Sequence, residues 1–214
     1  MLSKSLNPSK ALIFRITHVE NLPWILDNGL HCRNSPNKDP DFVNLGNPDL
    51  IEKRSRRVVP VAPGGTLSDY IPFYFTPYSI MLYNIHTGHG GVARVPRRDI
   101  VILVSSLHKV DQLGLNFAFT SGHAYPVYAE YYNQLGDLNE IDWDLLQRRN
   151  FQNDPNDPEK KERYQAEALI HGHLPIDALN GVACYDADQK ASIEAWLAER
   201  QIPLKVIAQP AYYF

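Results

Sequence analysis

Glu167 is the residue whose type and position most clearly suggest chemistry. It lies in the run QAEALI (165–170), which is otherwise almost apolar, directly after a long polar segment. A carboxylate is costly to bury unless it has a partner, so a glutamate at the start of an apolar strand suggests one of two roles. It is either a strand-edge residue that faces water or a catalytic group whose substrate is enclosed by the preceding loop. The pattern alone leaves both roles open.

The remaining motifs exclude several other kinds of chemistry. His86 and His89 are three residues apart, and His171 and His173 are two apart, with no acidic residue at ligand spacing. We therefore expect no metal cofactor. The segment SGH at 121–123 lacks the G-x-S-x-G pattern of a nucleophile elbow. The chain has no G-x-G-x-x-G or Walker A motif and no C-x-x-C pair, so a Rossmann site, a P-loop and a structural zinc site are not supported.

Basic residues form two clusters, although the net charge of −3 gives no general sign of nucleic-acid binding. The first is KRSRR at 53–57, and the second contains the arginines of RVPRR at 94–98. Each is either a solvated face or a contact surface for phosphates. The chain also has 12 tyrosines, which suit both an aromatic core and stacking on bases or on nicotinamide.

Length and composition are typical of one soluble globular domain spanning 1–214. The chain has 214 residues, of which 44% are hydrophobic and 21% charged. No apolar run approaches the roughly 20 residues that span a bilayer, and the N-terminus lacks the apolar core of a signal peptide. We expect a cytoplasmic protein that does not contact a membrane.

The expected elements describe an α+β fold with many short strands. In the first unit, a strand leads to a helix that is capped by Asn21 and ends at Gly29. A long excursion over 31–63 contains a helical piece near 49–57, and a polar loop covers 150–162. Strands are expected at 11–16, 70–75, 100–105, 117–120, 181–185 and 205–209. Helices are expected at 22–28, 79–86, 107–113, 124–134, 141–149 and 187–200.

Over nearly its whole length the sequence resembles the DarT family of DNA ADP-ribosyltransferase toxins. The segments that carry the resemblance are FRITHVENLPWILDNGL (14–30), IEKRSRRVVPV (51–61), PGGTLSDYIPFYFTPYSIMLYNI (63–85), TSGHA (120–124), RYQAEALIHGHLP (163–175) and the terminal YYF. The resemblance implies two facing, mainly antiparallel sheets with NAD⁺ as co-substrate in the cleft between them and short helices around them.

The resemblance also implies which residues form the site. The catalytic residues would be Glu167, His123 and one arginine of the first basic cluster, which we take as Arg54 with Arg56 and Arg57 as alternatives. The residues that would contact NAD⁺ are His18, Asn21, Gly29, Arg54, Tyr74 and Met81. The residues that would contact DNA belong to the loop 148–164 and are Arg148, Arg149, Phe151, Arg163 and Tyr164.

The family's chemistry accounts for these residue types. A glutamate stabilises the positive charge that develops as nicotinamide leaves, an arginine neutralises phosphate, and a histidine is a conventional base. The implied acceptor is a thymine in single-stranded DNA, and a macrodomain antitoxin is the implied partner of a monomeric toxin. Alternatives are a guanine acceptor, an RNA or protein acceptor, and a nucleic-acid-binding module without catalysis.

Overall fold

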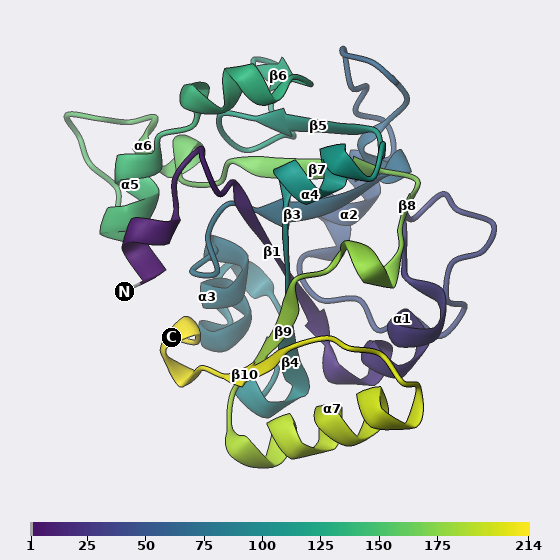
Figure 1. Ribbon diagram of the computed structural model, residues 1–214. Helices are drawn as coiled ribbons and strands as arrows, with labels where there is room; N and C mark the ends of the chain where they lie inside the picture. The colour runs from purple at the N-terminus through teal and green to yellow at the C-terminus, as the bar shows by residue number, and fades with distance from the viewer. Residues whose placement is uncertain (1) are drawn as a thin grey trace.

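Eight strands form one mainly antiparallel sheet, and two short strands form a second sheet, in the computed structural model, which describes residues 2–214 (Figure 1). The order in the large sheet is β10-β9-β4-β1-β3-β7-β5-β6, and β2 pairs with β8. Its strands are β1 (Leu12–His18), β3 (Tyr70–Tyr74), β4 (Ile100–Ser106), β5 (Phe117–Thr120), β6 (Tyr131–Tyr132), β7 (Glu167–His171), β9 (Gly181–Cys184) and β10 (Val206–Ala208). The small sheet contains β2 (Leu30–His31) and β8 (His173–Leu174).

Short helices surround the strands. The α-helices are α1 (Leu22–Asn28), α2 (Pro48–Arg54), α3 (Ile80–Thr87), α4 (Leu107–Gln112), α5 (Trp143–Arg148), α6 (Lys160–Arg163) and α7 (Ala187–Glu199). The 3-10 turns are η1 (Leu2–Ser5), η2 (Val19–Asn21), η3 (Leu67–Asp69), η4 (His89–Gly91), η5 (Arg97–Asp99), η6 (Leu135–Glu140), η7 (Ile176–Ala178) and η8 (Pro210–Tyr212). Within residues 2–214, no helix is both long and apolar enough to cross a bilayer.

The large sheet divides into two halves at β1 and β3. Strand β1 pairs with β4 along its whole length, and β3 pairs with β7 from Tyr70↔His171 to Tyr74↔Glu167. Between β1 and β3, however, the register consists of one pair, Phe14↔Tyr74. In Figure 1, β1, β4 and β9 run steeply through the molecule, whereas β3, β5 and β7 lie across it. The two halves correspond to the two sheets that the family resemblance implied. They are joined at this one pair and separate beyond it, and we call the opening between β1 and β3 the fork.

The local sequence explains the unit that follows β1. Pro23 lies in the first turn of α1, where its missing N–H leaves no helical hydrogen bond unmade. The helix ends at Gly29, whose φ of 76° is strained for a residue with a side chain. Asn21 occupies the N-cap position as predicted, but its side chain makes no capping bond. It bonds instead to Thr17 Oγ1 at 3.0 Å and to the backbone of Val43.

One predicted element is wrong. The helix expected over 124–134 is absent, and this segment forms a turn followed by β6. Pro126 interrupts the helical pattern, and Tyr131 pairs with Thr120 of β5. The hydroxyl of Tyr131 donates to the carbonyl oxygen of Ala124. Tertiary pairing therefore overrides the local helical preference. The other predicted strands and helices form, most of them shifted or shortened by one or two residues at an end.

Gly29 and Gly64 offer a matched test of this packing. A Cβ on Gly29 would lie 2.6 Å from the carbonyl oxygen of Leu174 and 2.6 Å from His173 Nε2, whereas one on Gly64 meets nothing within 4 Å. Both glycines have positive φ. We expect Gly29→Ala to lower the free energy of unfolding by about 2 to 4 kcal/mol, because it combines strain with a backbone clash, and Gly64→Ala to lower it by about 1 kcal/mol. Urea unfolding measures both, and equal losses would contradict the role of Gly29 against β8.

Candidate functional site

A cavity of about 640 Å³ occupies the fork between β1 and β3. Its floor includes Arg15 of β1, Tyr74 of β3 and Glu167 of β7. The segment 38–48 and the following helix α2 line the opposite wall. The volume lies within the roughly 300–1,000 Å³ typical of pockets that enclose a small molecule. The opening of the sheet therefore supplies an enclosed site lined by charged side chains.

Glu167 lies at the bottom of this cavity and is 1% exposed. Its Oε1 accepts hydrogen bonds from Arg54 Nη1 at 3.2 Å and from the backbone N–H of Ala124 at 3.1 Å. Arg54 Nη2 forms an ion pair with Oε2 at 3.0 Å. The backbone N–H of Glu167 donates to Thr120 Oγ1 at 3.2 Å. The carboxylate is therefore held by groups from α2 and the loop after β5, and the backbone of Glu167 is held by β5.

These contacts determine the charge of the pair. Burial alone would raise the pKa of Glu167, but Arg54, His123 and the Ala124 N–H together hold this pKa below its usual value. Burial would lower the pKa of Arg54, and the neighbouring Glu167 more than compensates, so this pKa is raised. Both side chains are therefore charged at neutral pH. Burial, together with the Glu167 carboxylate, raises the pKa of Tyr74, which keeps that phenol protonated.

Helix α2 places Arg54 over the carboxylate. Asn47 caps the helix by accepting from the N–H groups of Asp49 and Leu50, and Pro48 begins it. Arg54 is its last residue, which suits a cation at the negative end of the helix dipole. Arg54 is also the arginine chosen from the sequence.

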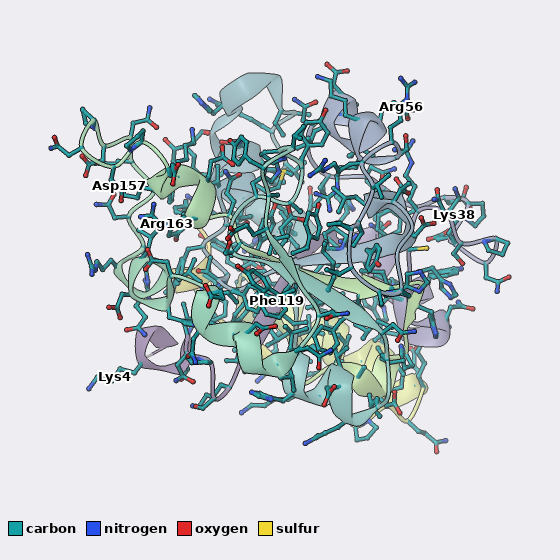
Figure 2. All side chains as sticks on the ribbon, turned by 90° about the horizontal axis from the view of Figure 1, so that it is seen from above. Lys4, Lys38, Arg56, Phe119, Asp157 and Arg163 are labelled. Atoms are coloured by element: carbon teal, nitrogen blue, oxygen red, sulfur yellow. The ribbon has the colours of Figure 1, made fainter. Side chains whose placement is uncertain are left out.

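The two alternative arginines have other positions. Arg57 donates through Nη2 to the carbonyl oxygens of Pro126 at 2.8 Å and Val127 at 3.1 Å. Arg56 is exposed, and Figure 2 shows it at the edge of the molecule. Of the three candidates, only Arg54 contacts Glu167.

His123 is the third predicted catalytic residue, and it lines the same cavity. Its Nε2 lies 3.7 Å from Glu167 Oε1, and its backbone N–H donates to the carbonyl oxygen of Glu162 at 3.0 Å. Gly122 makes this approach possible, because a Cβ there would lie 3.0 Å from the same carbonyl oxygen. The structure therefore brings Glu167, Arg54 and His123 together from three distant parts of the sequence.

Arg15 was missed by the sequence analysis. It lines the cavity from the middle of β1, and its Nη1 donates across the fork to the carbonyl oxygen of Pro72 at 2.8 Å. Its buried Nε has no hydrogen-bond partner within residues 2–214. Burial and then the positive charge of Arg54 lower the pKa of Arg15 to about 10, so it remains protonated near neutral pH. A charged residue inside the apolar strand LIFRITH is the same signal that singles out Glu167, and it could have identified Arg15.

The predicted NAD⁺ contacts divide into two groups. Arg54, Tyr74 and Met81 line the cavity. His18, Asn21 and Gly29 do not line it. His18 Nδ1 instead accepts from the N–H of Glu20 at 3.3 Å, while Asn21 anchors Val43 and Gly29 packs against β8. These three residues therefore shape the wall of the cavity without facing into it.

Several of the predicted DNA contacts also contact other side chains of the protein. Tyr164 is buried and donates to the carbonyl oxygen of Tyr78 at 3.1 Å. Arg163 pairs with Asp157 at 2.7 Å and with Asp142 at 3.3 Å. The other contacts are Arg149, whose guanidinium lies 3.7 Å above the ring of Tyr78, and Phe151, which packs against Tyr83, Tyr164 and Phe214. Arg148 is exposed.

The tip of the predicted DNA-binding loop also lies away from the cavity. In Figure 1 the loop between α5 and α6 is on the opposite side of the molecule from α2. Figure 2, turned by 90°, again separates Asp157 and Arg163 from Arg56 and Lys38. The end of the same loop returns to the site, because the carbonyl oxygen of Glu162 accepts from the backbone N–H of His123 at 3.0 Å and β7 begins at Glu167, four residues after Arg163.

No group of three or more His, Cys, Asp or Glu side chains that could hold a metal ion occurs in residues 2–214. Cys32 and Cys184 are both buried and free.

Comparison with known proteins agrees with this geometry. Residues 14–214 match the family model described as "ssDNA thymidine ADP-ribosyltransferase, DarT". A DNA ADP-ribosyl transferase of Escherichia coli O127:H6 is 53% identical, over 99% of this chain and 97% of the relative. The fold superposes on Thermus sp. 2.9 DarT in complex with ADP-ribosylated ssDNA with a TM-score of 0.86 and 32% identity, over 97% and 98% of the two chains. The same protein in complex with NAD⁺ gives a TM-score of 0.81, over 97% and 99%. The predicted ADP-ribosyltransferase fold is confirmed.

The buried ion pair makes a prediction about stability. Arg54→Met leaves the Glu167 carboxylate buried without its main partner, and we expect the free energy of unfolding to fall by about 3 to 5 kcal/mol near pH 8. Without Arg54, burial raises the pKa of Glu167 above its unfolded value. Stability is then lost as the pH rises through that raised pKa, so the deficit should be smaller near pH 5.

The double variant Arg54→Met/Glu167→Gln is the control, because it removes both charges. It should be more stable than Arg54→Met alone near pH 8 and should lack the extra pH dependence. Urea unfolding at the two pH values measures this. A deficit in Arg54→Met that does not change with pH would contradict the pairing.

Proposed function

Because this chain belongs to the DarT family of single-stranded DNA thymidine ADP-ribosyltransferases, we propose that it transfers ADP-ribose from NAD⁺ to thymine at the cavity that holds Glu167. The enzyme class, an NAD⁺-dependent DNA ADP-ribosyltransferase, follows from the family. The residue roles below are our proposal. The observation that carries them is the buried contact of Arg54 and His123 with one carboxylate, Glu167.

The cavity suits NAD⁺ in size and in charge. Four basic side chains and three acidic ones line it. At its floor, the charges of Arg15 and Arg54 are opposed by the single carboxylate of Glu167. A buried positive charge without a partner is costly, and an anionic ligand removes that cost. We assign the pyrophosphate of NAD⁺ to Arg15, whose guanidinium has an unpartnered N–H and a planar shape that matches phosphate.

Glu167 would act on the bond that breaks. The glycosidic bond of NAD⁺ cleaves with both electrons leaving on nicotinamide, whose ring nitrogen thereby loses its positive charge. The ribose carbon then carries developing positive charge, as in other glycosyl transfers. A carboxylate fixed in advance in a dry site stabilises that charge without reorganising. The charge on Glu167 is secured by Arg54, which holds the carboxylate ionised despite its burial.

His123 would accept the proton that the base loses. In thymidine, N1 is bonded to deoxyribose, so N3 is the ring nitrogen that carries a proton. As N3 forms the new bond to the ribose carbon, its proton must leave. Imidazole is a conventional base near neutral pH, and His123 lies beside the carboxylate that marks the reacting carbon. A guanidinium is a poor base, so we give Arg54 an electrostatic role.

The biological setting follows from the acceptor. Modification of bases in DNA would harm the cell that makes the enzyme, and we propose that it is a toxin opposed by a macrodomain antitoxin that removes ADP-ribose. We propose a monomer, since Arg15, Arg54, His123 and Glu167 all come from one chain. The cytoplasm is the proposed location, because bacterial DNA lies there.

The acceptor can be tested by mass spectrometry of oligonucleotides incubated with the protein and NAD⁺. We expect a thymine-containing single strand to gain one ADP-ribose on the base, because N3 is free, and its duplex to gain little, because pairing hides N3. Glu167→Gln should lower the rate by about 10²- to 10⁴-fold, since it removes the opposing charge. Glu199→Gln, on the exposed side of α7, is the control.

Three outcomes would contradict this proposal. Near-normal turnover by Glu167→Gln would remove the role of that carboxylate. Label only on guanine, RNA or protein would change the acceptor but leave the NAD⁺ chemistry. Binding of DNA with no consumption of NAD⁺ would indicate a binding module without catalysis.

The role of Arg15 can be tested separately. Arg15→Met should raise the KM for NAD⁺ by about tenfold or more, because one charge-assisted contact to phosphate is lost, and should leave the KM for DNA unchanged. Arg15→Lys, which keeps the charge, should be less affected. Arg94→Met is the control, because Arg94 also donates to a carbonyl oxygen but lies outside the cavity. Calorimetry should show weaker binding of ADP-ribose to Arg15→Met, and unchanged binding would contradict the assignment.

A further inference from the structure

Three strongly exposed hydrophobic side chains lie near one another beside the cavity. Val127 is 87% exposed, Tyr128 is 74% exposed and Val58 is 61% exposed. The fourth large hydrophobic residue exposed in residues 4–214, Leu113, is 42% exposed and follows α4, before the opposite end of β5. Apolar side chains that gather on a surface indicate a binding site more often than isolated ones do.

Two sets of contacts hold this surface together. Arg57, next to Val58, donates to the carbonyl oxygens of Pro126 and Val127. Val59 and Ala124 belong to one small buried cluster, so the segment that carries Val58 packs against the start of the 124–128 turn. The two segments that carry the three exposed side chains are therefore held against each other.

The same two segments also contact the Glu167 carboxylate. Ala124, four residues before Tyr128, donates its N–H to Glu167 Oε1 at 3.1 Å. Arg54, four residues before Val58, contacts the same carboxylate. Each of the two segments that carry the exposed side chains therefore begins at a residue that contacts Glu167. The surface is therefore connected to the site through two short segments.

Cations border the surface. Lys53 and Arg56 are exposed on the segment that leads to Val58, and Figure 2 shows Arg56 reaching away from the body of the protein. Sites for single-stranded nucleic acid combine such cations, which contact phosphates, with aromatic rings on which bases stack. Lysine is depleted in protein–protein interfaces, whereas arginine and tyrosine are not, so the exposed Lys53 favours nucleic acid here.

We infer that this surface, which we call the flanking patch (Lys53, Arg56, Val58, Val127 and Tyr128), holds the nucleotides next to the modified thymine. The inference rests on the proposed function, because it takes single-stranded DNA as the acceptor. Tyr128 stacks on a neighbouring base, Val58 and Val127 cover its edge, and the two cations contact the backbone. The DNA contacts predicted at 148–164 stay a separate prediction, and the flanking patch adds a second surface to them.

The decisive experiment measures kcat/KM for a thymine-containing single strand at saturating NAD⁺. Tyr128→Ala should lower it by about 5- to 30-fold, through KM for DNA, because one stacked base is lost. Tyr128→Phe keeps the ring and should retain most of the activity. The KM for NAD⁺ should not change in either variant, which shows that the cavity is intact. Leu113→Ala, the exposed apolar control, should behave as wild type.

A thermodynamic cycle identifies the contact. An oligonucleotide with an abasic site beside the thymine also lacks the stacked base, so it should be a poorer substrate for the wild type. If Tyr128 stacks on that base, Tyr128→Ala should cause little further loss on the abasic strand. Arg56→Gln should lower the salt dependence of binding by about one phosphate contact, and Lys205→Gln should leave it unchanged.

The outcomes separate this inference from the proposed function. A wild type that modifies single strands, with Tyr128→Ala unaffected or equally impaired on normal and abasic strands, overturns the flanking patch alone. Loss of affinity only for a macrodomain protein in Tyr128→Ala overturns it in favour of a protein interface. A wild type that modifies no single strand overturns the proposed function, and the patch with it.

Discussion

The contact between Arg54 and Glu167 is the interaction on which the site depends. A carboxylate this deeply buried would be neutral without a cation beside it, because burial opposes charge. The pair joins α2 to β7 across 113 residues of sequence, and the Ala124 N–H adds the loop after β5. One interaction therefore fixes both the charge of the proposed catalytic group and the positions of the segments around it.

The divided sheet makes this arrangement possible. Where β1 and β3 pair at Phe14↔Tyr74, the backbone groups satisfy one another, and beyond that pair they separate. Arg15 spans the gap by donating to the carbonyl oxygen of Pro72, so the fork stays bridged while its interior remains open. An antiparallel sheet without this division would close the space that NAD⁺ is proposed to occupy. The cost is a second buried cation, which favours an anionic ligand.

Much of the fold could be predicted from local sequence, because its elements follow simple patterns. β-Branched runs gave strands, and Pro23 and Gly29 bounded α1 as expected. The failure was the helix expected over 124–134, where the sequence pattern was ambiguous and pairing of Tyr131 with Thr120 decided the outcome. Pairing with a distant strand leaves no periodic trace in a segment this short, so sequence analysis could not detect it.

The sequence by itself determined the family and, through it, the chemistry. It also singled out Glu167, because a charge inside an apolar strand is costly wherever the chain folds. Only the tertiary structure decided which arginine contacts that carboxylate. Arg54, Arg56 and Arg57 carry the same charge, but their side chains point in different directions from the end of α2 and the residues after it. The tertiary structure also showed that Arg163 and Tyr164 of the loop at 148–164 make contacts within the protein. Cations and aromatic rings look the same in a sequence whether they are free or paired, and pairing of distant residues is set by packing.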